Sequence, residues 1–306
     1  MFGTDIIRNN PITRRAPGPV RGYLRMVTAV AEDVAKTVAR QTGGDPFMHR
    51  DPRYIEQTLP TMRLAANVYH RAEVEGLQNI PAEGPVLLVG NHSGGTVIED
   101  TFVFAQAFYD HFGADRTFHQ LAHDLVFKMT GLRTLAQRWG TVPASPENMA
   151  EALRRDAALL VYPGGDHETF RPTWESARID FAQRTGFVKL ALEHDVPIVP
   201  VVAIGGQETG LFLGQGRRLA SFLQLDRFRL KVFPPVLGPP FGLTIMDLPG
   251  RIPLPAKISI RVLEPINLRQ TLGTDPDVDE GYDIITSTMQ ETLTELDEER
   301  TLPVVG

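Results

Sequence analysis

The sequence predicts an α/β fold in which a mixed, mostly parallel central sheet of about seven strands is flanked by helices. From Val74 onward, short apolar runs alternate with longer stretches whose apolar residues recur at spacings of three and four. Two of the apolar runs lead directly into glycine loops crowded with ionisable side chains. Open α/β sheets bind ligands at the carboxyl ends of their strands, so this placement agrees with the same fold class.

The N-terminal part of the chain precedes this alternation. Residues 1–18 are polar, rich in arginine and broken by proline, which predicts a flexible tail without a secretory signal. Residues 19–73 are predicted as a helical segment with an amphipathic helix from Pro19 to Gln41 and a second apolar-periodic piece over Ile55–Tyr69. These two helices could pack on the core or lie on a bilayer. Residues 74–306 then form one α/β domain.

Each further element follows from a local signal. Ser145-Pro146-Glu147 is the clearest helix start, because it combines an N-cap residue, a proline at the first helical position and an acid in the first turn. The predicted strands are the apolar runs 86–90, 117–122, 140–142, 159–162, 198–204, 228–233 and 258–263. The predicted helices lie near residues 99–112, 146–156, 181–194 and 283–299.

Composition excludes several classes of protein. With 31 basic and 37 acidic residues, a net charge of −6 and no basic block, the chain is not expected to bind nucleic acid. The absence of cysteine excludes a disulfide scaffold, a thiolate zinc site and a cysteine nucleophile, and it fits a reducing compartment. No stretch approaches the ~18 uninterrupted apolar residues of a spanning helix, so a soluble or membrane-surface protein is expected.

The first chemical motif follows the apolar run Val86–Gly90. It delivers Asn91 and His92 into a glycine loop, and Glu99-Asp100 stand at the start of the next predicted helix. A carboxylate that holds one ring nitrogen of a histidine lets the other nitrogen take a proton, so this pattern indicates a general base. The alternative is an ordinary strand-to-helix turn, with a hydrogen-bonded histidine and an acid that favours the helix dipole.

A second motif follows the apolar run Ala158–Val161. The segment from Tyr162 to Arg171 is a glycine turn that carries Asp166, His167, Glu168 and Arg171. Because both motifs stand where predicted strands end, they are expected to share one site.

Three other chemistries fit these residues less well. A metal site would have to use dispersed ligands without metalloprotease spacing, taken from His92, Asp100, Asp166, His167 and Glu168. Ser93 lies in no Gly-x-Ser-x-Gly elbow, which disfavours a serine hydrolase. No Gly-x-Gly-x-x-Gly opens a helix, so a dinucleotide cofactor is not expected either. We therefore expect no metal and no cofactor.

Four blocks together resemble the lysophospholipid (glycerolipid) acyltransferase superfamily, PlsC-like, and most closely its monoacylglycerol/diacylglycerol acyltransferase-like branch. The resemblance runs from about Val74 to Ile266 and makes residues 74–306 the acyltransferase domain. The blocks, in family order, are Val74–Pro81 with Gly84-Pro85-Val86, Asn91-His92 to Asp100, Tyr162–Gly165 with Glu168 and Arg171, and Gly186–Ala191 with Val196–Val201.

The chain departs from the family pattern at two places. The usual block has four residues between His and Asp, whereas seven separate His92 from Asp100. Asp100 is taken as the acid, with Glu99 as the alternative. Gly164 stands where the family often has Glu, and His167 stands where it has Arg. The resemblance suggests that Glu168 and Arg171 take over those acceptor contacts.

The resemblance implies a direct acyl transfer from acyl-CoA or acyl carrier protein to a glycerolipid hydroxyl, with His92 as base and Asp100 as its partner. A lysophosphatidate-type acceptor is favoured, with a neutral alcohol acceptor or an inactive lipid-binding relative as alternatives. The chain would then be a cytoplasmic protein held peripherally at the inner face of a membrane. Beyond the His–Asp pair, the predicted site comprises oxyanion donors Ser93, Gly94 and Gly95, acceptor contacts Gly164, Gly165, Glu168 and Arg171, and supporting residues Asn91, Glu99, Lys189 and Pro200.

Overall fold

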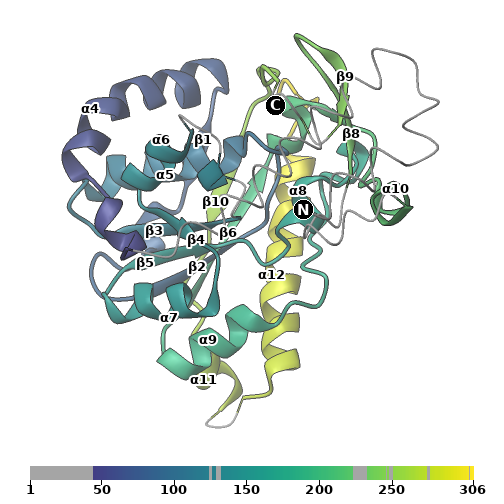
Figure 1. The fold of residues 1–306 in the computed structure, drawn as a ribbon. Helices are drawn as coiled ribbons and strands as arrows, with labels where there is room; N and C mark the ends of the chain where they lie inside the picture. The colour runs from purple at the N-terminus through teal and green to yellow at the C-terminus, as the bar shows by residue number, and fades with distance from the viewer. Residues whose placement is uncertain are drawn as a thin grey trace, which may run out of the picture.

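The computed structural model describes residues 44–123, 126–128, 132–222, 233–245, 247, 251–273, 276–302 and 304–306. The predicted tail 1–18, the helix predicted from Pro19 to Gln41 and most of the strand predicted over 228–233 lie outside these residues. The described residues form a seven-stranded sheet with helices on both faces, and a separate three-stranded sheet (Figure 1).

The central sheet has the order β1-β10-β6-β2-β5-β3-β4. Strands β6, β2, β5, β3 and β4 run parallel, whereas β10 is antiparallel to β6, and β1 runs parallel to β10. The mixed, mostly parallel sheet of the sequence analysis is therefore confirmed. The strand bounds are β1 Glu73–Glu75, β2 Val86–Gly90, β3 Phe118–Ala122, β4 Thr141–Pro143, β5 Ala158–Val161, β6 Ile198–Ile204 and β10 Ser259–Val262.

Helices cover the two faces of this sheet in separate groups (Figure 1). One apolar core lies between the sheet and α7 (Pro146–Arg154), α9 (Gly186–His194), α11 (Leu268–Leu272) and α12 (Val278–Glu298). The other core lies beneath α4 (Pro52–Arg63), α5 (Glu99–Phe112) and α6 (Leu132–Arg138). Strands β2, β5 and β6 are buried along their whole length, as expected for parallel strands covered on both faces.

Shorter pieces complete the chain. They are η1 (Pro46–His49), η2 (Leu64–Tyr69), η3 (Leu77–Asn79), η4 (Val126–Lys128), α8 (Asp166–Thr169), η5 (Thr173–Glu175), η6 (Gly206–Thr209) and α10 (Arg217–Phe222). None of the described helices has both the length and the apolar content that crossing a bilayer requires.

Two helix bounds differ from the sequence-based prediction for clear local reasons. The helix predicted from residue 181 begins at Gly186, because Ala182 and Gln183 adopt positive φ angles of 52° and 56° that end any preceding helical turn. The last helix begins earlier than predicted, at Val278. The side chain of Asp277 caps it by accepting the backbone N–H groups of Asp279 and Glu280.

The three-stranded sheet was not predicted. Its antiparallel strands β7 (Leu211–Phe212), β8 (Pro235–Gly238) and β9 (Gly242–Ile245) are two to four residues long, too short for a periodicity to be recognised. Phe212 of β7 is buried and its ring lies against the Gly94-Gly95 loop, since a Cβ atom built on Gly95 would come within 2.6 Å of that ring. The small sheet therefore backs directly onto the loop that follows β2.

Candidate active site

The two predicted motifs meet because their strands are neighbours. β2 pairs in parallel with β5, with Val89 opposite Val161, so His92 and Tyr162 leave the sheet at the same edge. The two rings stack, with centroids 4.2 Å apart and planes inclined by 16°. The hydroxyl of Thr101 donates to the hydroxyl oxygen of Tyr162 at 3.1 Å, which ties this stacking ring to the start of α5.

His92 is paired with Asp100. The distance between His92 Nδ1 and Asp100 Oδ2 is 3.3 Å, and the aspartate side chain is fully buried whereas 13% of the histidine side chain is exposed. Among the described residues none hydrogen-bonds to Nε2 of His92, so this nitrogen is open to a substrate. The geometry is that of a histidine held through one nitrogen with the other available to take a proton.

Asp100 is held in place by a full set of donors. Its Oδ2 accepts the backbone N–H of Ser93 at 2.8 Å and the Ser93 hydroxyl at 3.2 Å. Its Oδ1 accepts the backbone N–H and the hydroxyl of Thr101, at 2.7 and 3.2 Å. Asp100 is also in the first turn of α5, where the helix dipole favours a negative charge. These contacts hold the Asp100 carboxyl group in place beside His92.

Glu99 points elsewhere, although it precedes Asp100 directly. Its carboxylate lies 3.1 Å from Nη1 of Arg251, and Nε of the same guanidinium lies 3.2 Å from Asp247. All three side chains are buried. Burial raises the pKa of Glu99 to about 7 and that of Asp247 to about 6. Arg251 also donates to the carbonyl of Gly94 at 2.7 Å, so this buried ionic cluster anchors the glycine loop rather than the histidine.

The backbone N–H groups of the glycine loop Ser93–Gly95 all donate hydrogen bonds within the protein. The N–H of Ser93 donates to Asp100, that of Gly94 to Gln207 Oε1 at 3.2 Å, and that of Gly95 to the carbonyl of Thr169 at 3.2 Å. Ser93, Gly94 and Gly95 are expected from the sequence to bind an oxyanion. In this conformation each of their N–H groups already has a protein acceptor, so an oxyanion would have to displace one of them.

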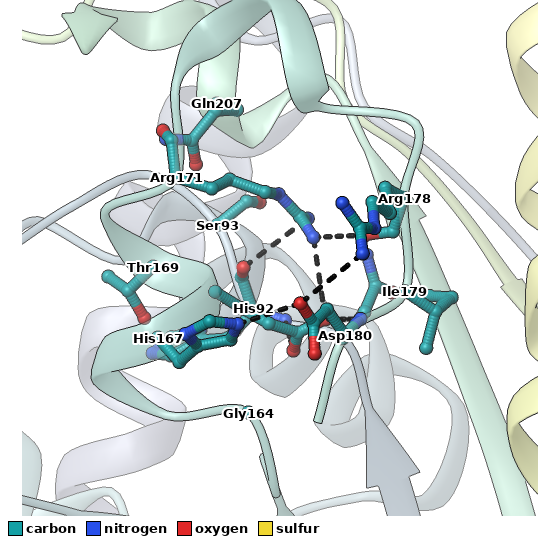
Figure 2. A network of polar contacts seen from close by, with 12 residues as sticks. His92, Ser93, Gly164, His167, Thr169, Arg171, Arg178, Ile179, Asp180 and Gln207 are labelled. Carbon is teal, nitrogen blue, oxygen red and sulfur yellow. Dashed lines mark hydrogen bonds and ion pairs between the residues drawn. The ribbon is translucent and has the colours of Figure 1, made fainter. Parts of the chain in front are cut away.

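Glu168 and Arg171 form the centre of the second motif, and both are buried. Glu168 accepts the backbone N–H groups of His92 and Asp180, each at 3.1 Å, and lies 3.4 Å from Arg171. Burial raises the pKa of Glu168 to about 7. Figure 2 shows the Arg171 guanidinium between the carbonyl groups of His92 and Arg178, to both of which it donates. Glu168 and Arg171 thus hold the backbone N–H and the carbonyl group of His92.

This arrangement explains why a glycine stands at position 164. A Cβ atom on Gly164 would lie 2.3 to 2.4 Å from the Cγ and carboxyl atoms of Glu168. The space beside the loop is therefore filled by the Glu168 carboxyl group, which comes from four residues further along the chain. Gly165 contributes differently: its φ of +48° turns the chain into α8, and Arg184 donates to the carbonyl of Gly164 at 2.9 Å.

Three further residues of the predicted site are Asn91, Pro200 and Lys189. Asn91 exchanges two hydrogen bonds of 2.8 Å with the backbone of Ala203 and so continues the contact between β2 and β6. Pro200 lies opposite Val89 inside β6. Its carbonyl accepts from Leu263, on the side away from β2, so its missing N–H removes no bond to β2. Lys189 is exposed on α9, and no described residue of the site contacts it.

Several site residues lie far from the motifs and carry no local signal. Gln207, Asp247 and Arg251 reach the loop from η6 and from the segment after β9. Asp180 pairs with His167 at 2.8 Å beside the Glu168 contact (Figure 2). A single Gln, Asp or Arg in a loop has no spacing that sequence analysis could recognise. Within the described residues, no three His, Asp or Glu side chains gather as a metal-binding group.

Comparison with known proteins shows which family the part of the chain around this site resembles. Residues 71–204, which span β1 to β6 and contain both motifs, match the family model described as acyltransferase. This part of the chain is therefore similar to an acyltransferase domain. The crystal structure of the 1-acyl-sn-glycerophosphate acyltransferase PlsC from Thermotoga maritima superposes with a TM-score of 0.52, at 16% identity, over 82% of this chain and 83% of that one. That similarity bears on the fold, and it confirms the expected architecture.

Several proteins are similar to this chain in sequence. An uncharacterized protein of Mycobacterium tuberculosis is 29% identical over 274 residues, which cover 88% of this chain and 74% of the relative. The cattle and human proteins named DGAT1/2-independent enzyme synthesizing storage lipids are 32% identical over 173 residues. That match covers 56% of this chain and only about half the length of those two relatives.

Proposed function

We propose that this acyltransferase moves a fatty acyl group from a thioester, acyl-CoA or an acylated carrier protein, directly to a glycerolipid hydroxyl. The observation that supports this is the contact between His92 and the buried Asp100, with Nε2 of the ring open to a substrate. The absence of cysteine from the whole chain and the burial of Ser93 agree with transfer that uses no acyl-enzyme.

In this mechanism His92 acts as a general base. Nδ1–H donates to Asp100 while Nε2 accepts the proton of the acceptor hydroxyl. The hydroxyl oxygen then forms a bond to the thioester carbonyl carbon and gives a tetrahedral intermediate. The C–S bond breaks as the intermediate collapses, and the proton on His92 passes to the departing thiolate. The products are an ester and a free thiol. Such assistance contributes roughly 10²- to 10⁴-fold to the rate.

We further propose a neutral acceptor hydroxyl, such as that of a mono- or diacylglycerol, rather than the lysophosphatidate-type acceptor that the family resemblance favours. The only cation that the sequence motif offers for a phosphate is Arg171. Its guanidinium is buried and is already matched by Glu168 and two carbonyl groups. Binding a phosphate there would break a buried ion pair. The name of the cattle and human relatives, which synthesise storage lipids, supports the same proposal.

The test is transfer of a labelled acyl group to a mixed pool of glycerolipid acceptors, with the products identified by mass spectrometry. His92→Ala should lower the rate by roughly 10²- to 10⁴-fold. His111→Ala is the matched control, since His111 is exposed at the far end of the helix that carries Asp100. Transfer by a folded His92→Ala protein at the wild-type rate would refute the mechanism. A wild-type protein that binds lipid without transferring acyl groups would favour the inactive relative.

Lipid substrates require contact with a membrane. We therefore propose that the protein associates peripherally with the cytoplasmic face of a membrane, where the thioester donor and the lipid acceptor meet. Co-sedimentation with anionic vesicles at low salt, and release at high salt, would support this location.

A further inference from the structure

The hydrogen bond between His92 and Asp100 sets only part of the orientation of the histidine ring. An N–H···O hydrogen bond usually spans about 2.7 to 3.2 Å, whereas His92 Nδ1 and Asp100 Oδ2 are 3.3 Å apart. One contact at one ring nitrogen also leaves the ring free to tilt, because the outer torsion of a histidine side chain has broad minima. The lone pair of Nε2 that takes a proton lies in the ring plane. A general base therefore needs a second contact that sets this plane.

Tyr162 supplies that contact. Its ring lies face to face with the His92 imidazole, with centroids 4.2 Å apart and planes inclined by 16°. Stacked rings at this separation pack closely, so a tilt of the imidazole would drive its edge into the tyrosine ring. The stack therefore fixes the plane of the imidazole, which the contact with Asp100 leaves open.

The Tyr162 ring is held in place by groups on two sides. Its hydroxyl oxygen lies 3.1 Å from that of Thr101, which in turn lies 3.2 Å from Oδ1 of Asp100. The ring also fills the space beside Gly90, where a Cβ atom would come within 2.6 Å of Cε1 of the tyrosine. Burial raises the pKa of Tyr162, so the phenol keeps its proton. Tyr162 thus contacts His92 directly and reaches the partner of His92 through Thr101.

The stack also suits the charge that His92 acquires during the reaction. In the proposed mechanism Nε2 takes the proton of the acceptor hydroxyl, so the ring is a cation while the tetrahedral intermediate exists. The face of an aromatic ring carries negative charge density and attracts a cation placed over it. An attraction of this kind changes an equilibrium by roughly 3- to 30-fold. The Tyr162 ring therefore favours the charged form of His92 over the neutral form.

We propose that Tyr162 is a positioning residue for acyl transfer, an inference that rests on the proposed role of His92 as the base. The tyrosine ring fixes the plane of the imidazole and stabilises the imidazolium, whereas Asp100 determines which ring nitrogen faces the acceptor. Tyr162 acts through His92 and makes no contact of its own with either substrate. Its removal should therefore lower kcat and leave KM unchanged.

The test compares Tyr162→Leu, which removes the ring, with Tyr162→Phe, which keeps it. Tyr162→Leu should lower kcat by about tenfold or more, with KM for the thioester and for the acceptor unchanged. Tyr162→Phe should retain kcat to within about threefold, because it loses only the contact with Thr101. Tyr54→Leu is the matched control, since Tyr54 is also partly buried and packs on the same apolar core, but lies on α4. It should lower stability and leave kcat unchanged.

Nuclear magnetic resonance of protein with labelled histidine rings measures the contact independently of activity, and it needs no folded Tyr162→Leu protein. The His92 signals are those missing from the spectrum of His92→Ala. In the wild type they should be shifted upfield by the ring current of Tyr162. Gly90→Ala places a methyl group against the tyrosine ring and should change that shift. Wild-type His92 signals at the position of an exposed histidine such as His49 would overturn the proposal.

Three kinetic results would overturn it as well. The first is a wild-type kcat in a folded Tyr162→Leu protein. The second is an equal loss of kcat in Tyr162→Leu and Tyr162→Phe, which would assign the effect to the hydroxyl. The third is a rise in KM at unchanged kcat, which would show that Tyr162 binds a substrate. Each of these requires an active wild type, whereas a wild type that transfers no acyl group would refute the proposed function and this inference together.

Discussion

The substitution Gly164→Ala isolates the role of Glu168 without touching any ionisable group. Gly164 has no positive φ, so alanine causes no backbone strain there, but its Cβ would lie 2.3 Å from the Glu168 carboxyl group. Glu168 is fully buried. We therefore expect the new methyl group to displace the carboxylate from its three partners.

The expected cost follows from what those partners lose. The backbone N–H groups of His92 and Asp180 each give up a charge-assisted hydrogen bond, and the buried Arg171 guanidinium loses its counter-charge. Removing one partner of a buried ion pair costs about 3–5 kcal/mol. The loss of the two hydrogen bonds is not added to this figure, because contributions from groups in contact are not additive. The free energy of unfolding should fall by about that amount, and kcat should fall as well because the backbone of His92 moves.

The assay is urea unfolding followed by circular dichroism, together with acyl transfer at saturating acceptor. Gly186→Ala is the matched control, because Gly186 opens α9 and a Cβ there meets nothing within 4 Å. It should leave stability unchanged or raise it by up to about 1 kcal/mol. A Gly164→Ala protein within about 1 kcal/mol of the wild type would show that Glu168 does not hold this loop.

Three further outcomes are expected. Asp100→Asn should lower kcat by about tenfold or more with little change in KM, whereas Glu99→Gln should mainly change stability; a larger kcat loss for Glu99→Gln would refute the pairing. Arg171→Ala should lower transfer to phosphate-bearing and neutral acceptors by equal factors in side-by-side kinetics, and a selective rise in KM for the phosphate-bearing acceptor would contradict the positioning role. Burial raises the folded-state pKa of Glu99 from 4.5 to about 7, so the folded protein keeps a proton that the unfolded chain releases. Stability should therefore fall as pH rises through this window, and unfolding measured at pH 5 and pH 7 should show a smaller fall for Glu99→Gln.

Local sequence was sufficient for six of the seven strands of the main sheet and for the position of His92, whereas the three-residue edge strand β1 (Glu73–Glu75) was not predicted. Strands such as Val86–Gly90 and Ile198–Ile204 are apolar throughout, which only a strand covered on both faces explains, and a glycine loop directly after such a strand places its side chains at the sheet edge. The helix at Pro146 was equally clear because its cap is contiguous in sequence. The N-terminal helix from Pro19 to Gln41 stays a prediction.

Tertiary structure decided everything that depends on partners distant in the chain. Glu99 and Asp100 are indistinguishable as adjacent acids at a helix start, and Arg251, 152 residues away from Glu99, determines which of them faces His92. The sequence predicts that Arg171 binds an anionic group of the acceptor. In the structure, its guanidinium instead contacts Glu168 and the carbonyl groups of His92 and Arg178. Burial is a property of the folded chain, and it makes this guanidinium an internal support for the loop that carries His92 instead of the ligand contact expected from the sequence.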